Sequence, residues 1–129
     1  MTNQPTQADN SEDSPIDWTV AQSLTAGDAE LLSELVELFP AESAKHLDSV
    51  RQAIGASDAE ALTRAAHTLK SSAGFFGAPK LVATALQVEN LGKAADIEAA
   101  RQCLAALEAE TARLTAALAT EHPPQGGQT

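Results

Sequence analysis

His67 and Lys70 are the residues of this chain whose types and spacing best suit group-transfer chemistry. Free imidazole is a good nitrogen nucleophile near neutral pH. A lysine three residues later in a helix lies beside the histidine on the same surface. Small or polar residues recur around this pair at helical spacing: Thr63, Ser71 and Gly74. Another macromolecule could therefore approach the ring closely, and the ammonium could reach a group attached to it.

The segment around His67 reads as an amphipathic helix. Its apolar positions form one core face: Leu62, Ala66, Leu69 and Ala73. On a helical wheel His67 lies about 140° from that face, so its ring is expected to be exposed. An exposed histidine is usually only solvated, and small residues on a helix also allow close helix packing. The residues alone leave those interpretations open.

A phosphoryl group is one chemical group that this arrangement could accept and transfer. Attached to the ring it would carry about two negative charges, which a lysine ammonium could offset. An exposed nucleophile flanked by small residues fits transfer between two proteins, whereas a hydrolase would enclose its site from water.

The rest of the chain predicts an all-α fold. Ala and Leu dominate its middle, and no run alternates between apolar and polar residues as a strand would. The pattern predicts five helices: from Asp17 to Leu24, from Asp28 to Gly55 with a kink or interruption at Pro40, from Ser57 or Asp58 to the turn at Phe76–Pro79, from Pro79 to near Gly92, and from about Asp96 to Leu118. The short connections favour antiparallel neighbours in a bundle.

Charge and composition exclude several functions. The chain has 129 residues, 18 acidic against 8 basic, and a net charge of -10. That is enough for one domain, and such acidity disfavours nucleic acid and anionic membranes as partners. Residues 61–96 are the exception, with 4 basic and 2 acidic residues around His67. The local charge supports placing a phosphoryl site there.

The terminal segments and the single cysteine indicate the domain bounds and the cellular setting. Polar residues 1–15 and 122–129 have little to bury and are expected to be disordered, leaving one domain at 16–121. There is no apolar run long enough to span a membrane, and the polar start, which lacks an apolar stretch, is not expected to be a signal peptide. Cys103 is the only cysteine and is expected in the core, so a reduced, cytoplasmic setting is expected. His46 and His122 are not at metal-ligand spacing with His67.

The run from Ala65 to Ala78 resembles the signature of histidine-containing phosphotransfer (HPt) domains. In that family an A-H-x-L-K-[GS]-[SGA]-[AS] run is followed by a glycine ten residues after the histidine, which is Gly77 here. The run Glu89–Lys93 resembles the family's [EQ]-x-L-[GE]-[RK] pattern, and Ile16–Trp18 is similar to the family's opening. The resemblance covers about residues 16–121.

The resemblance implies an antiparallel four-helix bundle with an additional short N-terminal helix. It implies that His67 accepts a phosphoryl group from a receiver-domain aspartate and passes it to another receiver. Lys70 would stabilise the phosphoryl group, and Gly77 would belong to a close-packed turn. Glu89 stands where some members use Gln to hydrogen-bond the ring, and Ser71 stands where Gly is common. Thr63 and Gly74 complete the near-site residues.

The partners implied are response-regulator receiver domains and a hybrid histidine kinase, in a multistep two-component phosphorelay. The chain carries no nucleotide-binding loop, so it is expected to be a phosphoprotein intermediate and not an enzyme. No cofactor or metal of its own is expected, and Mg²⁺ would be held by the receiver. A monomer is the simpler expectation.

Two alternatives remain open at this point. The chain could be a helical adaptor that binds receivers without phosphotransfer. It could also be a phosphoacceptor domain that a separate histidine kinase serves in trans. Phe75 lies about 140° from the core face and is either part of a docking surface or half-buried against a neighbouring helix.

Overall fold

The computed structural model describes residues 14–121. Within this range the chain forms five helices and no strand, as the sequence predicts. They are α2 (Trp18–Leu24), α3 (Ala29–Gly55), α4 (Ala59–Phe75), α5 (Pro79–Lys93) and α6 (Ile97–Thr120).

Aspartate side chains begin four of these helices and explain where they start. Asp17, Asp28, Asp58 and Asp96 are the N-caps of α2, α3, α4 and α6, and each carboxylate accepts a hydrogen bond from a backbone N–H of the first turn. Such a cap is worth about 1 kcal/mol. Helix α5 has no side-chain cap, but Pro79 stands in its first turn, where a missing N–H costs nothing. The predicted helix starts are therefore confirmed.

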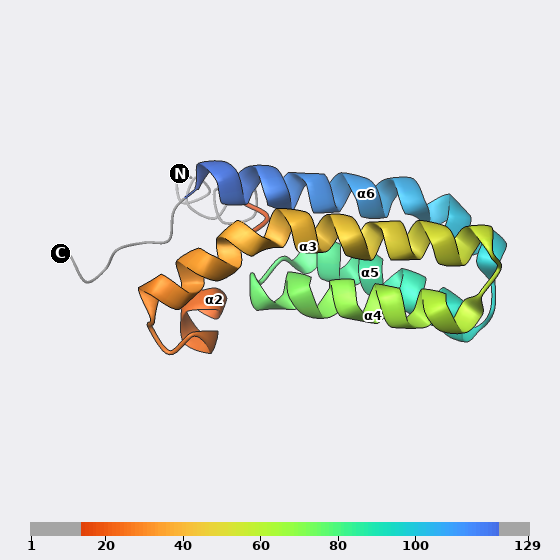
Figure 1. Cartoon of the computed structure of the whole chain (residues 1–129), viewed down its shortest axis with the longest axis horizontal. Helices are drawn as coiled ribbons and strands as arrows, with labels where there is room; N and C mark the ends of the chain where they lie inside the picture. The colour runs from red at the N-terminus through yellow and green to blue at the C-terminus, as the bar shows by residue number, and fades with distance from the viewer. Residues whose placement is uncertain (1–13, 122–129) are drawn as a thin grey trace, which may run out of the picture.

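Pro40 lies inside α3 without ending it. Proline cannot donate the hydrogen bond to the residue one turn earlier, and its ring crowds that turn. The helix nevertheless continues to Gly55, and the Ser43 hydroxyl donates a hydrogen bond to the carbonyl of Pro40. In Figure 1 the N-terminal part of α3, drawn in orange, departs from the direction of the rest of the helix. The predicted kink is present and the alternative, an interruption, is not.

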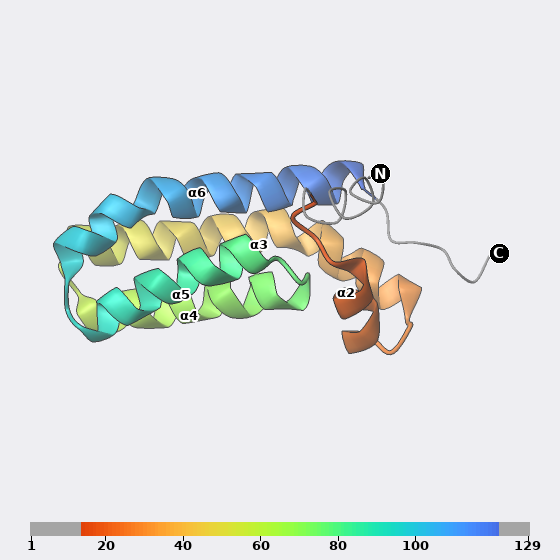
Figure 2. The same cartoon turned by 180° about the vertical axis from the view of Figure 1, so that it is seen from behind.

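The four long helices form an antiparallel bundle, and α2 packs across one end. Helix α4 packs on α3 and α5, while α6 packs on α5 and α3, which closes the bundle. Figure 1 and Figure 2 show the chain running back and forth along the long axis, with α2 beside the first turns of α3. The predicted four-helix bundle with a short additional helix is confirmed.

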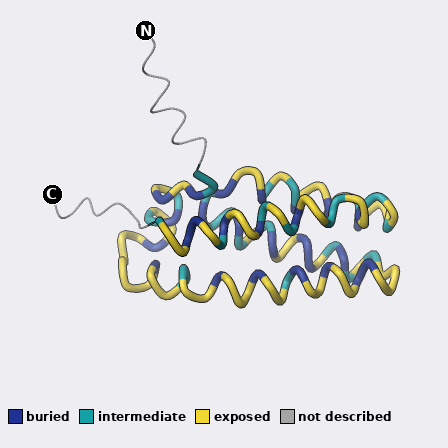
Figure 3. The backbone as a smooth tube through the Cα atoms, turned by 90° about the horizontal axis from the view of Figure 1, so that it is seen from above, coloured by how far each residue is buried: buried dark blue, intermediate teal, exposed yellow. Residues whose placement is uncertain are grey.

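Each long helix buries one face, as the banding along the tubes in Figure 3 shows. The predicted core face of α4 is fully buried: Leu62, Ala66, Leu69 and Ala73 are all 0% exposed. Trp18, Phe39 and Phe76 are also buried, and Cys103 is partly buried against this core. Burying a leucine side chain contributes about 1.5–3 kcal/mol, so this face fixes how α4 is rotated in the bundle.

The turn between α4 and α5 is held against α2. The backbone N–H of Asp17 donates to the carbonyl of Phe76 over 2.8 Å. Gly77 follows with φ +60°, a left-handed conformation that favours glycine. A Cβ at this position would lie 2.6 Å from the Cβ of Asp17, so a side chain is also excluded by space. Gly77 therefore lies in a closely packed turn, as the resemblance implied.

The predicted tails fall almost entirely outside the described residues. Of residues 1–15 and 122–129, only Ser14 and Pro15 are described, and both are half-buried. The Ser14 hydroxyl lies 3.0 Å from a carboxylate oxygen of Glu121, which also accepts from the indole N–H of Trp18. The start of the described chain is thus tied to the end of α6. No helix among residues 14–121 is long and apolar enough to cross a membrane.

Candidate functional site

His67 lies on the outer face of α4, in the middle of the helix. Its side chain is 58% exposed, as the helical wheel predicts. One ring nitrogen, Nδ1, lies 3.0 Å from Oε2 of Glu89 on α5. The ring is therefore open to solvent on one side and held by the neighbouring helix on the other.

Glu89 is a buried carboxylate with three cationic or ionisable neighbours. Its side chain is only 6% exposed, although it lies beside the exposed ring. The Lys70 ammonium lies 2.7 Å from Oε1, and the Lys93 ammonium lies 3.7 Å from Oε2. Buried carboxylates need such partners because removal from water disfavours the charge. The carboxylate therefore ties the motif of α4 to the last turns of α5.

The neighbouring Lys70 and His67 side chains keep the Glu89 carboxylate ionised. The Lys70 ammonium, above all, lowers the pKa of the Glu89 carboxyl below its usual range, and the His67 ring lowers it further. Burial acts in the opposite direction and does not prevail. Glu89 is ionised at neutral pH, and an ionised carboxylate can only accept hydrogen bonds. The proton of the contact therefore lies on Nδ1 of His67.

In the neutral form of the ring, a proton on Nδ1 leaves the other ring nitrogen, Nε2, with its lone pair. Among residues 14–121 no group is hydrogen-bonded to Nε2. A neutral imidazole that donates from Nδ1 to a carboxylate is oriented and made more electron-rich, as in catalytic histidine–carboxylate pairs. The arrangement can present Nε2 as a nucleophile to a partner that approaches the exposed face of α4.

The other near-site residues predicted from the sequence fall into two groups. Ser71 is exposed, and a Cβ at Gly74 would meet nothing within 4 Å, so both leave the surface near His67 open. Thr63 donates its hydroxyl to the carbonyl of Ala59, and it packs against α5 instead of the ring. Gly77 lies beyond the end of α4, against Asp17, and does not reach His67.

Two residues of α5 make contacts at this site that the sequence did not indicate. Lys93, interpretable as a simple surface charge, is the third neighbour of the Glu89 carboxylate. Gly92, expected only near the end of its helix, is buried against Thr63. The sequence signal for Lys93 was its spacing of four residues from Glu89, which pairs side chains in a helix. Gly92 could not have been found this way, because the contact joins two helices.

Phe75 is half-buried and packs against the core, as one of the two interpretations expects, and its role in a docking surface stays a prediction. Its ring packs edge-on against Phe76 at 4.9 Å between centroids. It also lines a surface groove of about 170 Å³ between α3 and α4, together with Leu35, Leu38, Glu42 and Ser72. The side chain of Leu38 in this groove is among the exposed large apolar residues.

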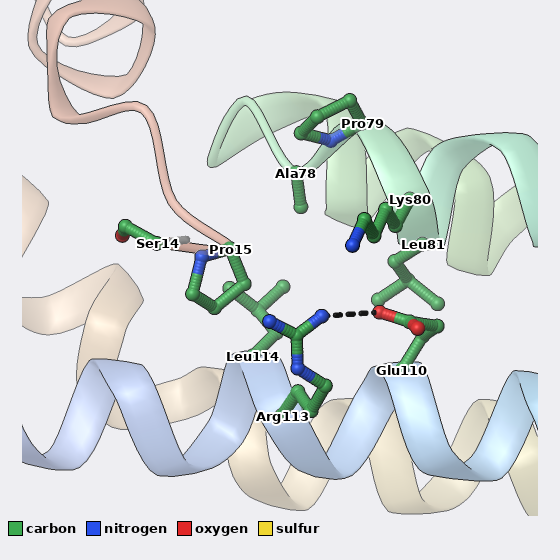
Figure 4. Close-up of a pocket in the computed structure, with 9 residues that line it drawn as sticks. All are labelled: Ser14, Pro15, Ala78, Pro79, Lys80, Leu81, Glu110, Arg113 and Leu114. Atoms are coloured by element: carbon green, nitrogen blue, oxygen red, sulfur yellow. Dashed lines mark hydrogen bonds and ion pairs between the residues drawn. The ribbon is translucent and has the colours of Figure 1, made fainter. Parts of the chain in front are cut away.

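Other candidates in the described part of the chain offer less chemistry. His46 lies 3.9 Å from Glu42 in α3, far along the sequence from the His67 motif. Among residues 14–121 there is no cluster of His, Cys, Asp and Glu suited to hold a metal ion. A small cavity of about 30 Å³ lies where Pro15 meets the start of α5 and the C-terminal half of α6. Figure 4 shows the residues that line it, with the Arg113–Glu110 ion pair of 3.1 Å at its edge. It has room for only about two water molecules.

Comparisons with known proteins agree with this geometry. The family model described as Hpt domain matches residues 34–117, which is more than half of the chain. The fold is similar to the crystal structure of histidine-containing phosphotransfer protein B (HptB) from Pseudomonas aeruginosa PAO1, with a TM-score of 0.75 and 25% sequence identity over 81% of this chain and 91% of that chain. No curated protein sequence matches the chain significantly. The chain belongs to the Hpt family, whose members are histidine phosphotransfer carriers of phosphorelays.

Proposed function

We propose that His67 is the phosphorylated residue of this carrier, and that it moves a phosphoryl group between receiver domains. The observation that carries the proposal is the 3.0 Å contact between Nδ1 of His67 and the buried Glu89 carboxylate, which leaves Nε2 free on an exposed face. The neighbouring Ser71 and Gly74 leave room for a receiver to bring its aspartate to the ring.

The transfer follows from these atoms. The lone pair of Nε2 attacks the phosphorus of an aspartyl phosphate, and the bond between phosphorus and the aspartate oxygen breaks. The aspartate leaves as a carboxylate, and the proton on Nδ1 stays where it is. The phosphorylated ring then carries a positive charge, which the Glu89 carboxylate stabilises. Attack by the carboxylate of a second receiver reverses the same steps.

Lys70 has a second role in this proposal. Its ammonium is bound to Glu89 and its side chain is 25% exposed, so it is held beside the ring at partial exposure. A phosphoryl group on Nε2 would add about two negative charges one turn away, and a flexible lysine can turn toward them. Mg²⁺ and the activation of the aspartate belong to the receiver in this proposal, and the carrier supplies no nucleotide site of its own.

The receiver is proposed to cover the groove beside Phe75 as well as His67. Phe75 follows His67 by eight residues, which is about 12 Å along a helix. A domain of ordinary size that contacts the ring would cover this distance, since a standard interface buries about 800 Å² on each partner. The exposed side chain of Leu38 at the rim offers it apolar area. The donor is proposed to be a hybrid histidine kinase with its own receiver domain.

Labelling by a phosphorylated receiver tests the proposal. Wild type should acquire an acid-labile, alkali-stable phosphate, and His67→Gln should acquire none. His46→Gln is the matched control, because His46 lies on α3 and should leave labelling unchanged. Equal labelling of wild type and His67→Gln would refute the assignment of His67.

The same experiment separates the alternatives. Binding of a receiver without labelling would indicate an adaptor. Labelling by a kinase core that lacks any receiver domain would indicate a phosphoacceptor domain served in trans. Rates measured against a panel of receivers would identify the preferred donor and acceptor as those with the fastest transfer.

A further inference from the structure

We infer that Gly92 is a positioning residue, which sets the distance between α4 and α5 beside His67 and thereby holds Glu89 within reach of the ring. The inference rests on the proposed function of His67 and assigns to Gly92 the spacing on which that function depends. Gly92 contacts Thr63 on α4 and does not contact the His67 ring itself.

The contact between Gly92 and α4 is too close for any side chain. A Cβ at Gly92 would lie 2.5 Å from Oγ1 of Thr63, 3.0 Å from its backbone N and 3.2 Å from its Cα. Two of these atoms belong to the backbone and cannot rotate away. The Thr63 hydroxyl is also fixed, since it donates to the carbonyl of Ala59 over 2.8 Å. A methyl group at position 92 therefore has to push the helices apart.

Backbone conformation gives no separate reason for a glycine here. Gly92 is inside α5, and it is not among the residues with positive φ. The left-handed residue that ends this helix is Ala95, at φ 57°, whose N–H donates to the carbonyl of Gly92. A glycine inside a helix costs up to about 1 kcal/mol relative to alanine. The space next to Thr63 is what explains it.

This contact lies one helical turn from the site. Helices α4 and α5 run antiparallel and side by side (Figure 1 and Figure 2). Gly92 follows Glu89 by three residues, and Thr63 precedes His67 by four. Residues at these spacings lie above one another on a helix. The pairs Gly92–Thr63 and Glu89–His67 are therefore successive levels of one interface.

The hydrogen bond between His67 and Glu89 tolerates only a small increase in the distance between the two helices. Nδ1 and Oε2 lie 3.0 Å apart, and beyond about 3.5 Å such a contact is no longer a hydrogen bond. A shift of α5 large enough to admit a methyl group would use up that margin, because a helix moves as a stiff unit over one turn. The two ammonium groups that contact the Glu89 carboxylate are Lys70 on α4 and Lys93 on α5. Lys93 lies on the same helix as Glu89, so a shift of α5 would carry both away from the ring, whereas Lys70 would stay on the helix of His67.

Two readouts on Gly92→Ala test the inference. The tautomer of His67, measured from ring nitrogen shifts by NMR on the unphosphorylated protein, should change from a proton on Nδ1 to a mixture. The initial rate of transfer from a phosphorylated receiver should fall about tenfold or more, as expected for loss of a hydrogen bond to a charged group. Gly55→Ala is the matched control, because a Cβ at this helical glycine meets nothing within 4 Å.

A second variant keeps the test decisive if Gly92→Ala folds poorly. Thr63→Ala removes the nearest atom, Oγ1, so the double variant Gly92→Ala with Thr63→Ala should recover part of the tautomer and part of the rate. A folded Gly92→Ala with the wild-type tautomer and rate would overturn the inference. Failure of both variants to fold would also overturn it, since the contact would then serve the whole bundle. The tautomer does not require phosphorylation, so absence of labelling in wild type would count against the proposed function alone.

Discussion

Oε1 of Glu89 lies 2.7 Å from the ammonium of Lys70, so the lysine already has an anionic partner before any phosphoryl group is present. Stabilising a phosphohistidine therefore requires Lys70 to leave or share that carboxylate. In the proposed reaction this exchange is favoured because the phosphoryl group carries more charge than the carboxylate. We therefore propose that Glu89 controls both the nucleophile, through Nδ1, and the cation that stabilises the product.

Glu89→Gln should slow phosphorylation of His67 by about tenfold, since a neutral amide oxygen accepts a weaker hydrogen bond than a carboxylate. Glu89→Ala should be slower still, because it leaves Nδ1 with no acceptor at this position. Initial rates with one phosphorylated receiver measure both. Glu108→Gln is the control, because it removes a carboxylate that is paired with Arg51 on the exposed surface. An unchanged rate in Glu89→Ala would refute the role of this residue.

Glu89 should also make stability depend on pH. The Lys70 ammonium lowers the pKa of its carboxyl below the ordinary value of 4.5, so the unfolded chain takes up this proton first as pH falls. The stabilisation is fully present above pH 4.5 and is lost as pH falls through the lower pKa of the folded state. Urea unfolding of wild type and Glu89→Gln should therefore differ most at neutral pH. A difference that grows in acid would contradict the sign of the shift.

Lys70→Ala should shorten the lifetime of phosphohistidine by about fivefold to tenfold, because it removes the cation that offsets the phosphoryl charge. The helical circular-dichroism signal should persist, since the core face of α4 is unaffected. Lys80→Ala, at an exposed position in the first turn of α5, is the control and should leave the lifetime unchanged. Collapse of the helical signal in Lys70→Ala would show that the ion pair with Glu89 is structural.

Gly77→Ala should destabilise the fold by about 2 kcal/mol or more, through left-handed strain and a clash with Asp17. Gly27→Ala isolates the strain, because Gly27 has φ +77° but a Cβ there would meet nothing within 4 Å. That variant should lose only about 1–2 kcal/mol. Chemical denaturation compares the two, and equal losses would show that the contact with Asp17 adds nothing.

Leu38→Glu should weaken receiver binding by about tenfold while leaving stability nearly unchanged. Leu38 is 54% exposed at the groove beside Phe75, so a charge there affects a docked partner more than the fold. Ala105→Glu places the same charge on an exposed position of α6, which packs on α3 and α5. Titration calorimetry with a receiver should find normal affinity for this control. Equal affinity in both variants would exclude the groove from the interface.

Local physics made most of the fold predictable. Asp17, Asp28 and Asp58 predict helix starts because a short carboxylate satisfies free backbone N–H groups within its own turn. The periodic leucines and alanines of α4 fix which face is buried, and hence that His67 is exposed, because both depend only on spacing along one helix. The kink at Pro40 follows from its missing N–H in the same way.

The sequence by itself determined the helices, the exposed histidine and the resemblance to a family, since each is a property of one segment. Only the tertiary structure decided that Glu89 is buried against His67, that Lys70 is bound to the same carboxylate, and that Gly92 closes on Thr63. These contacts join α4 to α5 and depend on helix rotation and separation to within about 0.5 Å. The packing of the whole bundle sets the rotation and the separation of the helices. The spacing of residues along the chain does not encode these contacts.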